Sequence, residues 1–240
     1  MSVTVEQNEK VCVECGKESG EIFKEFKGRS FKLCICKYCN SRVDKYVEFD
    51  TVLVFLDIIL HKVAAYRHVV FNITPKIHWQ LGIIYLLCDT YIKWYNIKHK
   101  KSRDFGTITD FSVLEMQFYF MFILSCSEAI VFLSAIFAEL WIYAALKETS
   151  GPSRFRDVLR VLLLSSFGKL LAFPAVVWSQ THNAIYLSVA RLFIVTSNIV
   201  ALNVILKEML AAVIIVLVGN AVLYSFISLY ETFHIHEYLI

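Results

Sequence analysis

The chain is short of the residues that interrupt helices, and it is short of charge. Three prolines and eight glycines occur in 240 residues, so long irregular tracts are not expected. Charged residues make up 19%, against about 25% in an average soluble domain, whereas hydrophobic residues reach 57%. A net charge of +3 is too small to argue for a nucleic-acid partner. These shortages favour a helical membrane protein over an ordinary soluble domain.

Several functional motifs are missing as well. There is no G-x-S-x-G, P-loop or H-E-x-x-H, and no carboxylates are paired at catalytic spacing, so we expect no enzymatic activity. The first eleven residues, MSVTVEQNEKV, lack the basic start and apolar core of a cleaved signal peptide. We therefore expect the front of the chain to stay in the cytosol, where thiols remain reduced and cysteine clusters bind metals.

Two C-x-x-C pairs lie in the polar front of the chain. Cys12 with Cys15 and Cys36 with Cys39 are separated by twenty residues. Each such turn directs two thiolates at one ion, and four thiolates at about 2.3 Å complete the tetrahedron of a structural Zn(II) site. So small a segment cannot fold on its own core, and metal binding supplies roughly 10–16 kcal/mol to such peptides. A RING domain is excluded, because it needs eight ligands and this segment contains no histidine.

The residues between the pairs have the pattern of a strand and a turn. Phe31, Leu33 and Ile35 alternate with polar or small residues, and residues 27–30, Lys-Gly-Arg-Ser, are typical of a turn. Two strands with a cysteine turn at each end describe a zinc ribbon. We assign this ribbon to residues 1–49.

Cys34 leaves one alternative open. It lies two residues before Cys36, so both side chains point the same way along a strand and Cys34 could replace Cys36 as a ligand. The geometry of a C-x-x-C turn favours Cys36 together with Cys39. The simpler interpretation is that Cys34 is a small residue without a role in metal binding.

The next segment, residues 50–76, is expected to form an amphipathic helix that begins at Asp50. One face would carry Phe55, Ile58, Ile59, Lys62, Val63, Tyr66 and Val70, and the opposite face Asp57, His61, Ala65 and His68. The apolar run 51–60 is too short to cross about 30 Å of hydrocarbon. An interfacial helix fits, and a re-entrant one is the alternative.

Four blocks follow one another within residues 12–72: C-x-E-C-G, C-x-x-C, V-D-K-Y-V-E-x-D and D-x-x-L-H-K-x-x-A-Y-R-H-x-x-F-N. Together they resemble the Arv family, the "ACAT-related protein required for viability" proteins of the endoplasmic-reticulum membrane. The resemblance implies a role in sterol and lipid homeostasis, which composition alone does not reveal. Since the family pattern does not usually place a cysteine at Cys34, it also supports the two C-x-x-C pairs as the ligands.

The matched polar residues have two interpretations. Asp57, His61, Tyr66, Arg67 and His68 could contact lipid headgroups or a protein partner. Alternatively, Asp57 could pair with His61 along the helix while Arg67 and His68 face water. The sequence leaves both open.

Residues 77–240 are expected to form an all-α bundle with about four to five membrane-crossing helices. The apolar runs are 77–95, 116–146, 158–178, 184–206 and 210–230. The second run is longer than one crossing needs, so it is either a long tilted helix or a hairpin bent near residues 125–127.

Charged residues inside these runs are expected to be paired. Asp89 and Lys93 lie four residues apart and can form an ion pair on one helix face. Glu128 and Lys169 lie near the middle of their runs, where each costs roughly 2.5–3.5 kcal/mol unless it is paired or wet. We expect these two to meet inside the bundle or to line one polar cavity.

Two functions are compatible with these features. The first is a mediator of intracellular sterol and lipid transport at the endoplasmic reticulum, with membrane lipids, sterols among them, or glycosylphosphatidylinositol intermediates as cargo. The second is a non-catalytic adaptor that stabilises a complex of lipid-synthesis enzymes. In both, structural zinc is the cofactor and the ribbon faces the cytosol.

Overall fold

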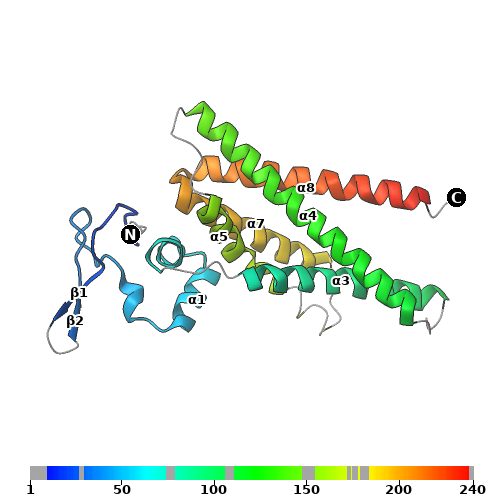
Figure 1. The fold of residues 1–240 in the computed structure, drawn as a ribbon, viewed down its shortest axis with the longest axis horizontal. Coiled ribbons are helices and arrows are strands. Elements are labelled where there is room, and N and C mark those ends of the chain that lie inside the picture. Colours follow the sequence, from blue (N-terminus) through cyan, green and yellow to red (C-terminus); the bar gives the residue numbers. More distant parts are fainter. Residues whose placement is uncertain are drawn as a thin grey trace, which may run out of the picture.

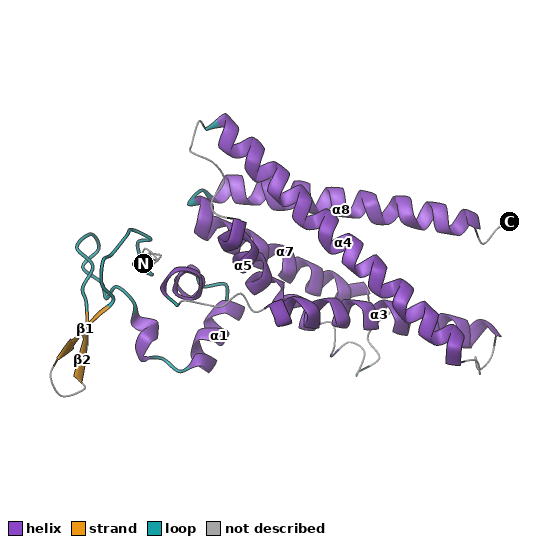
Figure 2. Ribbon diagram, viewed as in Figure 1, coloured by secondary structure: helices purple, strands orange, loops and turns teal. Residues whose placement is uncertain are grey.

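The computed structural model shows three parts, which follow one another along the chain (Figure 1). The described residues are 10–26, 30–73, 79–105, 111–147, 155–171, 174, 178 and 184–237. We call residues 10–43 the ribbon, residues 44–73 the connecting segment, and the helices from residue 79 onward the bundle. Figure 2 shows the strands confined to the ribbon and helices in the other two parts.

The ribbon contains one antiparallel hairpin. Strand β1 (Phe23–Phe26) pairs with β2 (Ser30–Leu33), with Phe23 opposite Leu33 and Phe26 opposite Ser30. The predicted strand is confirmed up to Leu33, but Ile35 forms only an isolated bridge with Arg42. The predicted turn at 27–30 falls largely on residues 27–29, which lie outside the described part of the chain.

The connecting segment is a series of short helices. These are the 3₁₀ turn η1 (Lys45–Glu48), α1 (Thr51–Ile59), α2 (Val63–Arg67) and the π-helical turn η2 (His68–Asn72). The predicted continuous helix from Asp50 was wrong. His61 adopts a left-handed φ of 57°, which ends α1, and the Lys62 N–H donates to the Asp57 carbonyl at 2.9 Å. The apolar spacing continues across this break, so periodicity alone does not reveal it.

The break also changes which residues face inward. Ile58, Tyr66 and Val70 are buried, as predicted for the apolar face. Ala65 and His68 were predicted on the opposite face, but they are buried too, with exposed fractions of 0% and 6%. The segment is therefore packed on more than one side.

The bundle consists of helices that run lengthwise beside one another in Figure 1. They are α3 (Trp79–Phe105), α4 (Phe111–Leu146), α5 (Phe155–Ser165), the 3₁₀ helix η3 (Ser166–Leu171), α7 (Ala184–Leu206) and α8 (Met209–Glu237). Helix α4 packs against α3 and α8, and α7 packs against α5, η3 and α8. The run 116–146 is thus one long helix and not a hairpin.

The run 158–178 does not form one regular crossing. Helix α5 ends at Ser165 and the chain tightens into η3. A Cβ on Gly168 would lie 2.7 Å from Ile194 of α7, so the glycine permits the close approach of η3 to α7. Residues 172–173, 175–177 and 179–183 lie outside the described part.

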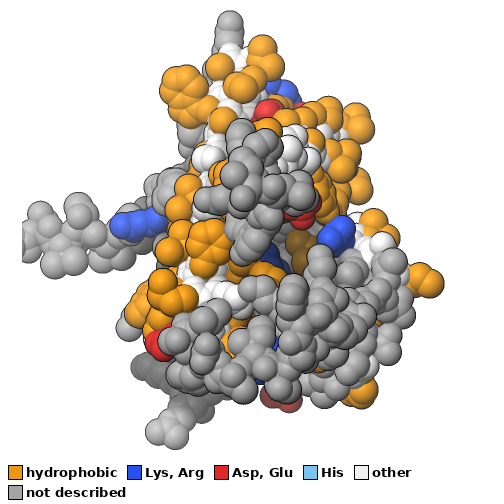
Figure 3. All heavy atoms as spheres, turned by 90° about the vertical axis from the view of Figure 1, so that its right-hand side faces the viewer, with side chains coloured by type: hydrophobic (Ala, Val, Ile, Leu, Met, Phe, Trp, Pro, Cys, Tyr) orange, Lys and Arg blue, Asp and Glu red, His pale blue; other side chains and the backbone are white. Residues whose placement is uncertain are grey.

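Three described helices are long and apolar enough to cross a membrane. They are Leu114–Leu146, Ser188–Leu206 and Met209–Thr232. Helix α3 and the α5–η3 segment, which the sequence suggested as further crossings, do not meet that measure of length and composition. Leu146 and Leu210 are 79% and 80% exposed, as befits side chains that face lipid. Figure 3 shows hydrophobic side chains around much of the described surface at one end of the bundle.

Candidate functional site

Each C-x-x-C turn is closed by a residue in the left-handed conformation. Gly16 has a φ of 73° and donates its N–H to the Cys12 carbonyl at 2.9 Å. Asn40 has a φ of 55° and donates to the Cys36 carbonyl at 3.0 Å. Glycine and asparagine are the residues that adopt this conformation most readily. The two turns therefore have the same backbone design.

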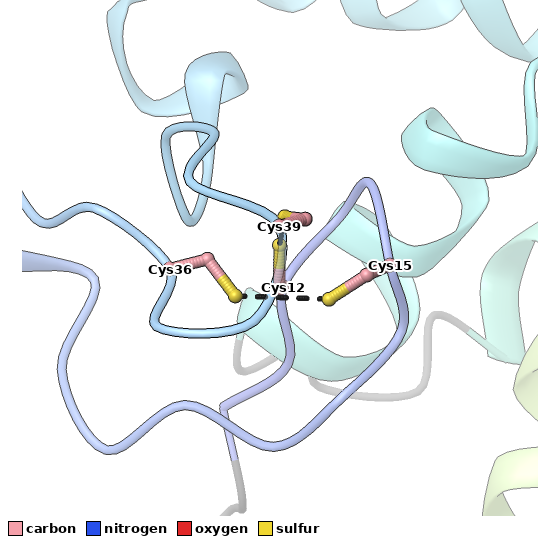
Figure 4. Close-up of side chains that lie close together, drawn as sticks. All are labelled: Cys12, Cys15, Cys36 and Cys39. Carbon is pink, nitrogen blue, oxygen red and sulfur yellow. Dashed lines mark hydrogen bonds between the residues drawn. The ribbon is translucent and has the colours of Figure 1, made fainter.

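The two turns bring their four sulfur atoms together. The Sγ atoms of Cys12, Cys15, Cys36 and Cys39 all lie within 4.8 Å of one another, and they point toward a common centre (Figure 4). The Cys12–Cys39 and Cys15–Cys36 sulfur distances are both 3.7 Å. A tetrahedron with metal–sulfur bonds of about 2.3 Å has edges of about 3.8 Å, so the four thiols fit one tetrahedral ion. Cys34 lies outside this group.

The thiols differ in how easily they ionise. Burial raises the pKa of Cys12 to about 12. Hydrogen bonds from the backbone N–H groups of Tyr38 and Cys39 lower the pKa of Cys36 to about 6. A divalent cation favours the thiolate form of all its ligands. Four thiolates would fill its coordination sphere, so the site suits a structural role and leaves no position for a substrate.

Arg67 of α2 ties the first cysteine turn to the connecting segment. Its Nη1 donates to the carbonyls of Val13 at 3.0 Å and Glu14 at 2.7 Å. A Cβ at Gly16 would lie only 3.1 Å from the Arg67 guanidinium carbon, so a larger residue would crowd this contact. One interpretation of the sequence had Arg67 facing water; in the structure it is half-buried, and its guanidinium binds the first cysteine turn.

A second link is built around the buried carboxylate of Asp44. Its Oδ1 accepts from the Tyr46 N–H at 3.0 Å, which starts η1. Its Oδ2 lies 2.7 Å from His68 Nδ1 and accepts from Asn72 Nδ2 at 2.6 Å. Asn72 also exchanges two hydrogen bonds with the backbone of Val11, both at 2.9 Å. The interpretation that His68 faces water was wrong, because it is needed here to satisfy Asp44.

Asp57 also bridges two elements. It accepts from the Tyr46 hydroxyl at 2.9 Å and forms an ion pair with Lys62 at 2.8 Å. The ion pair with Lys62, together with the Tyr46 hydrogen bond, lowers the pKa of Asp57. The expected pair between Asp57 and His61 was wrong, because the left-handed turn at His61 ends the helix that would have aligned them.

Tyr66 and His61 instead join the connecting segment to the bundle. The Tyr66 hydroxyl lies 2.8 Å from Ser197 Oγ, and both residues are fully buried. His61 Nε2 lies 3.4 Å from Thr196 Oγ1, and its ring meets Phe193 at a centroid distance of 4.9 Å. All three partners belong to α7.

A separate charge cluster lies inside the bundle. The predicted Asp89–Lys93 pair is confirmed at 2.8 Å. Glu128 does not pair with Lys169: it pairs with Lys93, at 2.7 Å, and Lys93 also donates to Ser125 at 3.1 Å. Lys93 thus bridges the two carboxylates, and within the described part of the chain no ion pair of Lys169 is recorded.

Sequence reasoning missed Asp44 and Asn72 as members of the polar network. A signal was present, because Asp44 stands just before a helical turn, where aspartate is a favoured cap. It also missed Lys93 as the partner of Glu128, and in that case no local pattern could show it, since the two are 35 residues apart.

The chain also matches known proteins over most of its length. A model of the Arv1-like family matches residues 11–202. Protein ARV1 of Mus musculus is 34% identical over 216 residues, covering 90% of this chain and 81% of the mouse protein. Protein ARV1 of Homo sapiens is 35% identical over 196 residues, covering 82% and 72%.

A fungal relative and the solved structures complete the comparison. Protein ARV1 of Saccharomyces cerevisiae is 42% identical over 62 residues, which is 26% of this chain and 19% of the yeast protein. No solved structure matches this chain. The resemblance found in residues 12–72 therefore extends across the ribbon, the connecting segment and most of the bundle, and the chain belongs to the Arv1-like family.

Proposed function

We propose that this multi-pass membrane protein mediates sterol and lipid homeostasis at the endoplasmic reticulum. In this proposal it moves sterols or lipid-linked intermediates such as glycosylphosphatidylinositol precursors. A structural zinc ion holds the ribbon, which faces the cytosol, and the protein performs no catalysis of its own. The observation that carries the proposal is the match to the Arv1-like family over residues 11–202.

The architecture supports this assignment. Four cysteines can hold a metal ion, and three helices can cross a membrane. Arg67 and Asn72 join the connecting segment to the ribbon, and Tyr66 joins that segment to α7. A ribbon that can hold a metal ion is thus joined, through the connecting segment, to helices that can cross a membrane, which supports a role at a membrane surface.

Reconstitution tests direct lipid movement. Purified full-length protein in donor liposomes is expected to accelerate transfer of a fluorescent sterol to acceptor liposomes. Tyr224→Phe, on the exposed surface of α8, serves as a matched variant that should keep the wild-type rate. Transfer no faster than that of protein-free vesicles contradicts direct transport.

One observation favours the alternative of a non-catalytic adaptor. Ile35 and Tyr38 of the ribbon are both 64% exposed, which places apolar groups where a protein partner could cover them. If the protein stabilises a complex of lipid-synthesis enzymes, such an enzyme should co-purify in stoichiometric amounts. Ile35→Asp combined with Tyr38→Asp should then abolish co-purification without loss of bound metal, whereas Glu18→Lys should not.

Two further measurements test the remaining parts of the proposal. Elemental analysis of the purified protein is expected to give one zinc per chain. Fluorescence microscopy of a tagged protein should give the reticular pattern of the endoplasmic reticulum, and a protease added to sealed microsomes should cleave the ribbon. Protection of the ribbon in intact microsomes contradicts the cytosolic placement.

A further inference from the structure

Helix α1 has a large apolar surface that the described part of the protein leaves mostly uncovered. Its exposed side chains are Val52 (68%), Leu53 (49%), Phe55 (47%), Leu56 (47%) and, just after its end, Leu60 (65%). Asp57 is the one charged residue of the helix, and Lys62 and Tyr46 engage its carboxylate. A contiguous apolar surface of this kind marks an interface with another protein or with a membrane.

The position of α1 against the bundle decides between these two occupants. Val54 and Ile58, on its inner side, belong to the same hydrophobic core as Ala201 and Val204 of α7. Phe55 meets Phe167 of η3 at a ring-centroid distance of 6.0 Å. The exposed surface of α1 is therefore continuous with the bundle surface.

The contacts with α7 also show how far along this helix the connecting segment reaches. Thr196 and Ser197, which meet His61 and Tyr66, lie within the candidate membrane span Ser188–Leu206. Ser197 is nine residues before Leu206, or about 14 Å at 1.5 Å per residue. Since a hydrocarbon core is about 30 Å thick, this distance places Ser197 inside the apolar part of α7 and not at its end. The side chains of the connecting segment thus reach below the level of the α7–α8 turn.

The orientation of the segment excludes a membrane crossing. In Figure 1, α2 and η2 are seen along their axis, whereas α4 and α8 run across the picture. Helices α2 and η2 therefore lie across the end of the bundle and not along it. With nine residues, α1 could not span the hydrocarbon in any case.

We infer that α1 inserts its apolar face, formed by Val52, Leu53, Phe55, Leu56 and Leu60, into the lipid leaflet on the ribbon side. The occupant of this surface is hydrocarbon, continuous with the lipid around α7. The helix lies in the plane of the membrane, and the ribbon, held by Arg67 and Asn72, rests directly above it. The inference goes beyond lipid transport and holds for a transporter and an adaptor alike.

Spin labels on the full-length protein in phosphatidylcholine nanodiscs test this. The background protein carries Cys34→Ser, Cys88→Ala and Cys126→Ala, and it keeps the four metal-site cysteines. Labels are placed at Leu53→Cys and Leu56→Cys. The references are Leu217→Cys, exposed within the span of α8, and Glu18→Cys, exposed on the ribbon. The background protein without an added cysteine should give no spin-label signal, which shows that the four metal-site cysteines do not react with the label.

The labels at positions 53 and 56 are expected to collide with oxygen more often than with a water-soluble nickel chelate. The ratio of the oxygen to the nickel collision rate should be close to the ratio at position 217 and well above the ratio at position 18. A ratio like that at 18 overturns the inference, because it places α1 in water. Low collision rates with both reagents also overturn it, because a protein then covers the face. Metal content verifies that each labelled protein is folded, and Val52→Cys provides another position on the same face.

Discussion

The front of the molecule and its bundle are held together in different ways. In the ribbon and the connecting segment, single polar groups with defined partners fix the structure: four sulfurs, the carboxylate of Asp44 and the guanidinium of Arg67. In the bundle, apolar surfaces pack along long helices, and the charge network around Lys93 is the main polar exception among the described residues. Substitutions should therefore be more damaging, residue for residue, in the front than in the bundle.

Removal of a metal ligand should give the largest difference between the two regions. Cys36→Ser is expected to abolish stoichiometric metal binding and to unfold the ribbon, because metal supplies roughly 10–16 kcal/mol to folds of this size. The helices of the bundle should persist. Elemental analysis and hydrogen exchange of residues 10–43 provide the measurement. Cys34→Ser is the matched control, and loss of metal in that variant would contradict the ligand set.

Loss of the buried carboxylate should have the next largest effect. Asp44→Ala leaves His68, Asn72 and the Tyr46 N–H without their acceptor, so we expect the front region to lose about 3 kcal/mol. Hydrogen exchange of residues 44–72 measures this loss. Asp50→Ala removes an aspartate whose side chain makes no capping hydrogen bond, and it should change little. Equal effects of the two variants would show that the Asp44 network does not stabilise the front.

A substitution in the charge network around Lys93 tests whether the stability of the bundle also depends on a polar contact. Lys93→Met leaves Glu128 unpaired in the apolar helix α4, at a cost of about 2.5–3.5 kcal/mol. Unfolding in mixed detergent should show this loss. The control is Lys98→Met, an exposed position on α3, the helix that also carries Lys93. A stability equal to the control would mean that water already solvates Glu128.

The contact between the connecting segment and the bundle should contribute less to stability than the polar networks within either region. Tyr66→Phe removes only the hydroxyl that bonds to Ser197, so we expect a loss of about 1 kcal/mol. Faster proteolysis between the connecting segment and the bundle would report it. Tyr224→Phe, on the surface of α8, should be neutral. If both variants behave alike, apolar contacts alone hold the joint.

The smallest expected effect depends on pH. The pKa of Asp57 is lowered in the folded protein, so its ion pair with Lys62 stabilises the front at pH values above the unfolded pKa of about 4. This stability is lost as the pH falls through the folded pKa. Asp57→Asn should cost about 0.5 kcal/mol at neutral pH and flatten the acid dependence of front-region unfolding, which Asp50→Asn should leave unchanged. An unchanged acid profile in Asp57→Asn would contradict the role of this pair.

The same contrast explains what the sequence could predict. The cysteine pairs and the Asp89–Lys93 pair follow from local spacing, and both were found. The contact of Asp44 with His68 joins residues 24 apart, and that of Lys93 with Glu128 residues 35 apart. Such partners are chosen by packing, which one sequence does not display. The left-handed His61 was missed because the apolar spacing continues on both sides of it.

The hydrogen bond between Tyr66 and Ser197 joins residues 131 apart, and this sets an order of events during synthesis. The ribbon leaves the ribosome early and can capture its ion at once, since all four sulfurs lie in the first 39 residues. The surface of α7 on which the connecting segment docks is completed only after about 200 residues have been made. During that interval Val54 and Ile58 of α1 lack the α7 residues against which they pack in the finished protein.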